Sequence, residues 1–143
     1  MAGMKRRTLL QGMGAAAMFA GLSGLEAQDK SSGAVFELRV YHCYDGKLPG
    51  LLKRFREHTM ALFERHGITN VAYWTPVDDG PLKDKTLFYI IKYPSREEAK
   101  IRWKAFSTDP EWVKVSAESQ VDGKLVEHAD STFLELTDFS PKV

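Results

Sequence analysis

VFELRVYHC, the stretch from Val35 to Cys43, alternates apolar and polar side chains. Side chains alternate between the two faces of a strand, so this pattern predicts a strand with two unlike faces. The apolar face consists of Phe36, Leu38 and Val40. The other face is polar and partly aromatic and consists of Glu37, Arg39 and Tyr41.

A helix is predicted after this strand, from Leu48 to His66, because apolar positions recur there at spacings of three and four. These positions are Leu48, Leu51, Leu52, Phe55, Thr59, Leu62 and Phe63. Gly67 follows at once, where a left-handed residue usually ends a helix. The turn residues from Tyr44 to Lys47 separate this helix from the strand.

Two further strands are predicted after the helix. The first, ITNVAYWTPV at residues 68–77, ends near Pro76 and is followed by the turn sequence of residues 78–81. The second, TLFYIIKY at residues 86–93, is apolar on both faces. Such a strand is typical of the centre of a sheet, covered on each side.

A second helical region begins after Pro94. Ser95 and Glu98 have the spacing of a capping box, and Asp109-Pro110 has the cap and first residue of another helix. The side chains expected to face the core are Ala99, Arg102 (by its stem), Trp103, Phe106, Trp112, Val115 and Ser116. After a turn at Asp122-Gly123, the stretch STFLELT predicts a fourth strand from Ser131 to Thr137.

The predicted order is β-α-β-β-α-β, which indicates an α+β, ferredoxin-like fold. Two helices, the second broken in two, would cover one face of a four-stranded antiparallel sheet. We expect the covered face to consist of Phe36, Leu38, Val40, Leu134 and Leu136. The opposite face would then expose aromatic rings and favour a ligand or a second copy, giving a two-fold homodimer. A monomer with a solvated sheet face is the alternative.

Residues 1–27 are predicted to be an export signal. Arg6 and Arg7 stand directly before apolar residues, and residues 12–25 carry no charge. This order is typical of a bacterial twin-arginine signal, with cleavage near Ala27. The apolar run is shorter than the roughly 20 residues that a permanent membrane span needs. We therefore expect a periplasmic or secreted protein; an amphipathic or disordered tail is the alternative, and retention of the signal as an anchor stays open.

The composition excludes several classes of function. Lys and Arg total 20 and Asp and Glu total 19, so the charge gives no reason to expect nucleic acid or an anionic membrane as a partner. Cys43 is the single cysteine, so no intramolecular disulfide can form, and we expect it to be a small buried residue. The sequence shows no Gly-rich phosphate loop, paired-cysteine metal motif or nucleophile elbow, and no metal site is predicted.

Four blocks of sequence resemble the NIPSNAP family of the dimeric α/β-barrel superfamily. They are FELRVYHCYDGKLPGLLKRF, HTMALFERHGITNVAYWTPV, LFYIIKYPSREEAKIRWKAFSTDPEW and STFLELTDFSP, within residues 36–141. The resemblance implies a domain at 34–141 after a polar linker at 28–33. It also implies a sheet that pairs with a second sheet to enclose a small barrel, while leaving the function of the family unsettled.

The candidate site is the lining of that barrel. The side chains expected there, as ligand-binding residues, are Glu37, Arg39, Tyr41, Trp74, Phe133 and Glu135. The guanidinium of Arg39 suits a carboxylate or an enolate, and the aromatic rings would form an apolar wall. The alternative is an ion-pair ladder across neighbouring strands, formed by Glu37, Arg39 and Glu135.

The four histidines receive separate predictions. His58 lies beside the apolar stripe and is a candidate acid, base or haem ligand. His66 precedes the stop glycine and has a structural role at the end of the helix. His42 is expected to pack on the helix side of its strand, and His128 to be exposed near a turn.

Two main hypotheses follow. The first is an exported protein that binds a small apolar or aromatic molecule in the dimeric barrel cavity. The second is a cofactor-independent or haem-assisted monooxygenase or isomerase, as occurs in the superfamily, with Arg39, Tyr41 and His58 as the catalytic candidates. Haem is the candidate cofactor of this second hypothesis. A role as a structural or assembly partner is a third possibility.

Overall fold

The computed structural model describes residues 33–143, so the predicted signal at 1–27 and nearly all of the linker lie outside the described residues. The strands are β1 (Val35–Cys43), β2 (Thr69–Trp74), β3 (Thr86–Tyr93) and β4 (Val126–Leu134). The helical segments are α2 (Leu48–Arg54), η2 (Phe55–Thr59), α3 (Met60–Arg65), α4 (Arg96–Ser107) and α5 (Pro110–Glu118). Within residues 33–143, no helix has the length and apolar character needed to cross a membrane.

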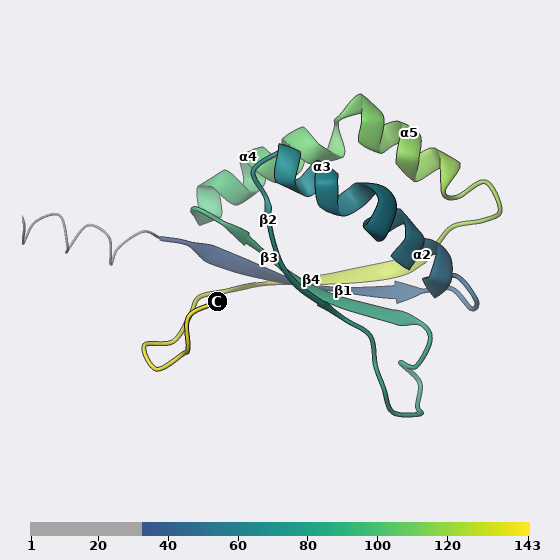
Figure 1. The fold of residues 1–143 in the computed structure, drawn as a ribbon, viewed down its shortest axis with the longest axis horizontal. Helices are drawn as coiled ribbons and strands as arrows, with labels where there is room; N and C mark the ends of the chain where they lie inside the picture. The colour runs from purple at the N-terminus through teal and green to yellow at the C-terminus, as the bar shows by residue number, and fades with distance from the viewer. Residues whose placement is uncertain (1–32) are drawn as a thin grey trace, which may run out of the picture. The chain divides into compact units, whose positions relative to one another are not determined.

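The four strands form one antiparallel sheet in the order β2-β3-β1-β4. The helices of residues 33–143 all lie on one side of this sheet, and within that range the other side has no helical layer (Figure 1). The prediction of an α+β, ferredoxin-like fold is therefore confirmed. The apolar strand β3 occupies a central place, as its sequence indicated.

The first helical region runs without a break from Leu48 to Arg65 and contains one turn of π-helix, η2. Inside η2 the hydroxyl of Thr59 donates a hydrogen bond to the carbonyl of Arg54 at 3.3 Å. Gly67 has a φ of 72°, so the left-handed stop is where the sequence predicted it.

The second helical region has the two predicted caps. The hydroxyl of Ser95 accepts a hydrogen bond from the amide of Glu98 at 3.0 Å. The carboxylate of Asp109 accepts one from the amide of Glu111 at 2.8 Å, and Pro110 opens α5. Because these caps depend on residues close in sequence, they fix the starts of α4 and α5 locally.

The prediction of which sheet face the helices cover is wrong. Arg39 pairs in register with Tyr89, which is fully buried in the core with the helices, whereas Val40 pairs with Phe88. The helix-facing side of β1 therefore carries Glu37, Arg39, Tyr41 and Cys43. Both faces of β1 include apolar or aromatic groups, so the alternation in β1 alone could not show which face the helices cover. The large rings of β3, which fill the space under the helices, determine it.

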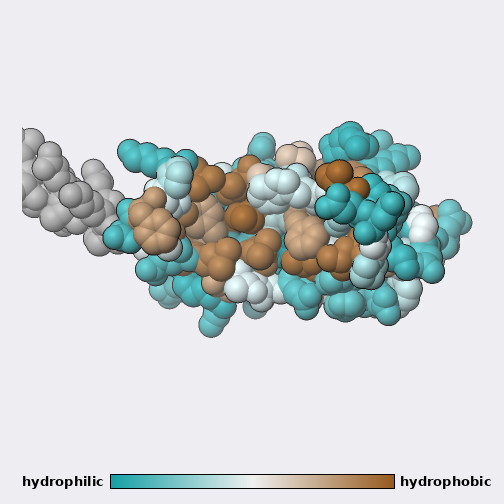
Figure 2. Space-filling model, turned by 90° about the horizontal axis from the view of Figure 1, so that it is seen from below, coloured by the Kyte–Doolittle hydropathy of each residue, from teal (hydrophilic) through white to brown (hydrophobic). Residues whose placement is uncertain are grey.

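The uncovered sheet face is largely apolar and is shown in Figure 2, which views the molecule from below. The residues of this open face are Phe36, Leu38, Val40, Ala72, Trp74, Phe88, Ile90 and Leu134. Trp74 keeps 50% of its surface exposed, and Leu134 keeps 39%. A face of this kind is a candidate surface for a second subunit.

The fourth strand begins five residues earlier than predicted and ends three residues earlier. The sequence favoured Ser131 to Thr137, but the ladder with β1 begins at Val126 and ends where Phe36 pairs with Leu134. Strand β4 is at the edge of the sheet and most of it is exposed, so it lacks the apolar alternation used to locate it. Its position is set by pairing with β1, which is not a local property of its sequence.

Candidate functional site

A pocket of about 370 Å³ opens between helix α4 and strands β1 and β4. We call it the α4 pocket. Its lining consists of Glu37, Arg39, Arg96, Ala99, Lys100, Trp103, Lys104, Ser107 and Phe133. Three of the predicted ligand-binding residues, Glu37, Arg39 and Phe133, are thus brought together, but on the helix side of the sheet.

The floor of the α4 pocket is a buried carboxylate with three donors. Glu37 is 3% exposed, and its carboxylate accepts hydrogen bonds from the phenol of Tyr93 at 3.0 Å and the hydroxyl of Ser131 at 2.6 Å. The guanidinium of Arg39 donates the third at 2.5 Å. A buried carboxylate needs such partners, because an unpaired one would be costly to desolvate.

Arg39 spans the pocket from this carboxylate to the aromatic wall. Its guanidinium carbon lies 4.1 Å from the ring centre of Trp103 and 5.4 Å from that of Tyr41, both within cation–π range. Burial opposes its charge, but the adjacent Glu37 carboxylate and its hydrogen bond favour the charged form, and the pKa of Arg39 is raised. Arg39 therefore remains a cation in a largely dry setting.

One polar atom of Arg39 is not used by the fold. Its Nε is buried and has no hydrogen-bond partner among the described residues. Buried donors are nearly always paired in native proteins, so this unpaired N–H sets Arg39 apart from an ordinary structural residue.

The phenols near Arg39 act as fixed neutral groups. Burial, reinforced by the neighbouring Glu37 carboxylate, raises the pKa of Tyr93 well above its usual range. Burial also raises the pKa of Tyr89, with Tyr41 adding to the effect. Both phenols are protonated at neutral pH, and Tyr93 is held as a donor to Glu37.

The rim of the α4 pocket is basic. The guanidinium carbon of Arg96 stands 3.6 Å from the ring centre of Phe133, and the exposed Lys100 and Lys104 lie along the same side of α4. The negative charge of Glu37 is already matched by Arg39. The positive charges of Arg96, Lys100 and Lys104 therefore have no acidic partner in the lining of the pocket. The arrangement suits a molecule with an apolar or aromatic body and a negative group.

The remaining predicted site residues lie elsewhere. Trp74 is on the open face, and Glu135 follows the end of β4 and is exposed. The imidazole of His58 is 45% exposed beside Glu57 and lines a separate hollow of about 320 Å³ between the first helical region and α5. Tyr41 lies next to the α4 pocket, with its hydroxyl 3.4 Å from a guanidinium nitrogen of Arg39.

The predicted ion-pair ladder across neighbouring strands does not form among the described residues: Glu37 and Arg39 pair, but both belong to β1, and Glu135 forms no ion pair. Sequence reasoning missed Trp103 and Arg96, since Trp103 was predicted only as a core residue. The signal available was spacing: residues 96, 100, 103 and 104 recur at three and four and so share one side of a helix.

The other three histidines lie at two places in the fold: His66 at the end of the first helical region, and His42 and His128 on neighbouring strands. His66 is 2.6 Å from the carboxylate of Asp109, which agrees with its predicted structural role. The prediction for His42 is wrong, because the reversed faces put its ring on the open side, stacked on the exposed His128. The expected exposure of His128 is confirmed, although it lies within β4.

A larger hollow, of about 710 Å³, lies between the β1–α2 turn and the β2–β3 loop. Its charged side chains belong to the two loops and to Arg56 of η2, and two of them, Asp45 and Lys85, already pair at 2.6 Å. It offers no buried charge to a ligand, so the α4 pocket is the stronger site.

Comparison with known proteins places this geometry in context. The family model described as NIPSNAP matches residues 36–141. No curated protein matches the chain. Among solved structures, a NIPSNAP family protein from Agrobacterium tumefaciens is 27% identical, with a TM-score of 0.64, covering 76% of this chain and 97% of that one.

Two further structures share the fold. An uncharacterized NIPSNAP-like domain protein from Burkholderia xenovorans is 19% identical, with a TM-score of 0.66, covering 78% of this chain and 92% of its own. SnoaB, a cofactor-independent oxygenase from Streptomyces nogalater, is 14% identical, with a TM-score of 0.51, covering 77% of this chain and 99% of its own. At these identities the likeness concerns the fold alone.

Proposed function

This chain belongs to the NIPSNAP family, and we propose that it binds a small aromatic or apolar molecule with an anionic group in the α4 pocket. The pocket lies within one subunit, not in the barrel cavity between subunits that the sequence suggested. The anionic group would meet Arg39, and the apolar body would lie against Trp103 and Phe133.

The observation that carries this proposal is the state of Arg39. It is a buried cation stacked on Trp103, with one N–H unpaired among the described residues and a basic rim above it. The Nε of Arg54 is also buried and unpaired within residues 33–143, so the unpaired Nε of Arg39 supports a site only together with the stack on Trp103 and the basic rim. An unpaired buried donor costs about 1 to 3 kcal/mol. Ligand binding would recover this cost.

The experiment compares naphthoate with its neutral amide, naphthamide, by quenching of tryptophan fluorescence and by calorimetry. Naphthoate is expected to bind at least tenfold more tightly, which corresponds to about 1.4 kcal/mol. Trp103→Leu and Lys100→Ala should weaken naphthoate binding, whereas Lys114→Ala, on the exposed side of α5, should not. Equal affinity for the two compounds, unaltered by Trp103→Leu, would rule out an anion site here.

A second candidate is catalysis in the same pocket, as a cofactor-independent oxygenase or isomerase. It is favoured by the cation of Arg39 in a desolvated pocket, since such a group stabilises an enolate or phenolate more strongly than it would in water. Tyr41 is the neighbouring phenol, and His58 has no part, because it lines another hollow. Arg39→Lys should then abolish oxygen uptake with a phenolic substrate while the circular dichroism spectrum is unchanged.

Haem does not fit the α4 pocket. Its lining contains no His, Cys, Met or Tyr, the side chains that commonly hold haem iron. We therefore derive no step through haem, and a haem titration that produced a Soret band lost in His58→Ala would point to the separate hollow instead.

We further propose that two copies associate through the open face and that residues 1–27 direct export to the periplasm. The apolar residues of that face support the first proposal, because burying them would shield rings now in water. The adjacent Arg6 and Arg7 support the second. Replacing both arginines with lysine should leave the protein in the cytoplasmic fraction. Capture of an unrelated protein in place of a second copy would favour the role of an assembly partner.

A further inference from the structure

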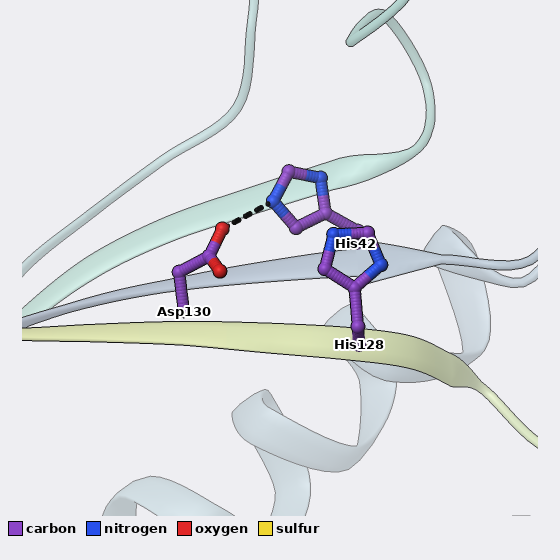
Figure 3. A group of neighbouring side chains, drawn as sticks. All are labelled: His42, His128 and Asp130. Carbon is purple, nitrogen blue, oxygen red and sulfur yellow. Dashed lines mark hydrogen bonds and ion pairs between the residues drawn. The ribbon is translucent and has the colours of Figure 1, made fainter.

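We infer that His42, His128 and Asp130 form a binding site for a divalent transition-metal ion on the open side of the sheet (Figure 3). This goes beyond ligand binding in the α4 pocket and does not depend on it, because the three residues lie on the opposite face of the sheet, the face through which we propose that two copies associate. We call the group the edge triad. Two residues come from edge strand β4 and one from its neighbour β1.

The geometry of the edge triad suits a single ion. Nε2 of His42 lies 3.0 Å from Oδ2 of Asp130, and the rings of His42 and His128 stack with centres 4.1 Å apart. One ligand atom from each residue lies within 4.8 Å of the other two. Atoms bound to one zinc ion at about 2 Å each are roughly 3 to 4 Å apart. Because an imidazole binds a metal in the plane of its ring, the exposed ring of His128 must turn out of the stack with His42 for both nitrogens to reach one ion.

A β-bulge creates this arrangement. His42 pairs with His128, but the next residue, Cys43, pairs with Val126, so Glu127 is an extra residue in β4. Val126 packs against the core on the helix side. In an unbroken strand His128 would share that side, because side chains alternate with period two. The bulge turns His128 to the side of His42, and bulges are frequent where a side chain is re-aimed for function.

The donor set indicates the class of ion. Two imidazole nitrogens and one carboxylate oxygen suit zinc, iron(II), cobalt(II) and similar ions, whereas magnesium and calcium prefer oxygen donors. Binding would replace water ligands of the ion and exchange the His42–Asp130 hydrogen bond for two bonds to the metal. Exposure of His128 and Asp130 gives the ion access and leaves positions open to water or a further ligand.

The simpler reading is a stacked histidine pair with one hydrogen bond, and the test separates the two. Zn²⁺ is titrated calorimetrically into the full chain, where one ion per chain is expected. His42→Ala, His128→Ala and Asp130→Asn should each weaken Zn²⁺ binding by roughly tenfold or more. His58→Ala is the matched control, since it removes an exposed histidine outside the triad.

Co²⁺ provides a second readout, because imidazole ligation changes its visible absorption. The change should occur in the unaltered protein and in His58→Ala, and should be lost in the double variant His42→Ala/His128→Ala. Absence of Zn²⁺ binding, or binding that survives in all three triad variants, would overturn the inference. The triad side chains are largely at the surface, so circular dichroism should confirm that the variants fold.

Discussion

The carboxylate of Glu37 and the phenol of Tyr93 meet at 3.0 Å on neighbouring strands, under the helices and beneath the α4 pocket. The same carboxylate holds Arg39 and Ser131. The polar floor of the pocket is thus a hydrogen-bonded network within the sheet. We expect its loss to lower the stability of the domain as well as to alter the pocket.

Glu37→Ala should therefore destabilise the domain by about 3 to 5 kcal/mol, because it leaves Arg39 as an uncompensated buried cation. Urea unfolding followed by circular dichroism measures the change. Glu135→Ala is the control; that carboxylate is exposed, and a change within about 0.5 kcal/mol is expected. Equal effects of the two substitutions would mean that the network contributes nothing.

Ser95→Ala should reduce the free energy of unfolding by about 1 kcal/mol, since the amide of Glu98 loses its cap. Ser95→Asp should retain most of the stability, because aspartate also caps a helix and its charge suits the helix N-terminus. Thermal unfolding of the three proteins makes the comparison. A serine that acted only through its small size would instead tolerate alanine and reject aspartate.

Asp109 links acid sensitivity to the start of α5. Hydrogen bonds from His66, then Arg65 and the amide of Glu111, hold the pKa of Asp109 well below its usual range. In the unfolded chain its pKa is about 3.9, so its contribution is complete above that value and is lost as the pH falls toward the folded value.

Asp109→Asn should consequently lower the melting temperature at neutral pH, and the difference from the unaltered protein should shrink as the pH falls below about 4. Melting curves collected across that range test the effect. Asp138 is an exposed residue after β4. The melting temperature of Asp138→Asn should follow that of the unaltered protein across the whole pH range. If the melting temperature of Asp109→Asn were lower by the same amount at every pH, the ionised carboxylate of Asp109 would not be the source of the stabilisation.

Trp74→Glu should convert the proposed dimer into a monomer, because it places a charge on the open face. Trp74 is half exposed in the single subunit, so the substitution should leave the subunit folded. Light scattering after size exclusion gives the mass. Val77→Glu is the matched control, since Val77 is 83% exposed in the loop after β2. A single-subunit mass for the unaltered protein at micromolar concentration would remove the dimer.

The features predicted well from sequence are those fixed by near neighbours. The caps at Ser95 and Asp109, the stop at Gly67 and the bounds of β3 depend on residues a few positions apart. The order of the helices and strands that these features delimit was enough to predict the ferredoxin-like arrangement.

What could not be predicted depends on distant partners. The covered face of β1 was decided by the rings of β3, and the bounds of β4 by its pairing with β1. The one-residue shift at Glu127 then set the side on which His128 lies. Accordingly Glu37 and Arg39 were identified as site residues but placed on the wrong side of the sheet, and Trp103 was missed as their partner.

The π-turn at η2 aligns two rings that a regular helix would offset by about 80° around its axis. Phe55 and Phe63 are eight residues apart, which is about 2.2 turns of α-helix, yet both rings approach Tyr89, at 5.1 and 6.3 Å. A spacing of seven residues, about 1.9 turns, would align them without any widened turn. The segment thus behaves as a heptad with one inserted residue, and a chain one residue shorter between these phenylalanines could keep the same aromatic cluster in an unbroken α-helix.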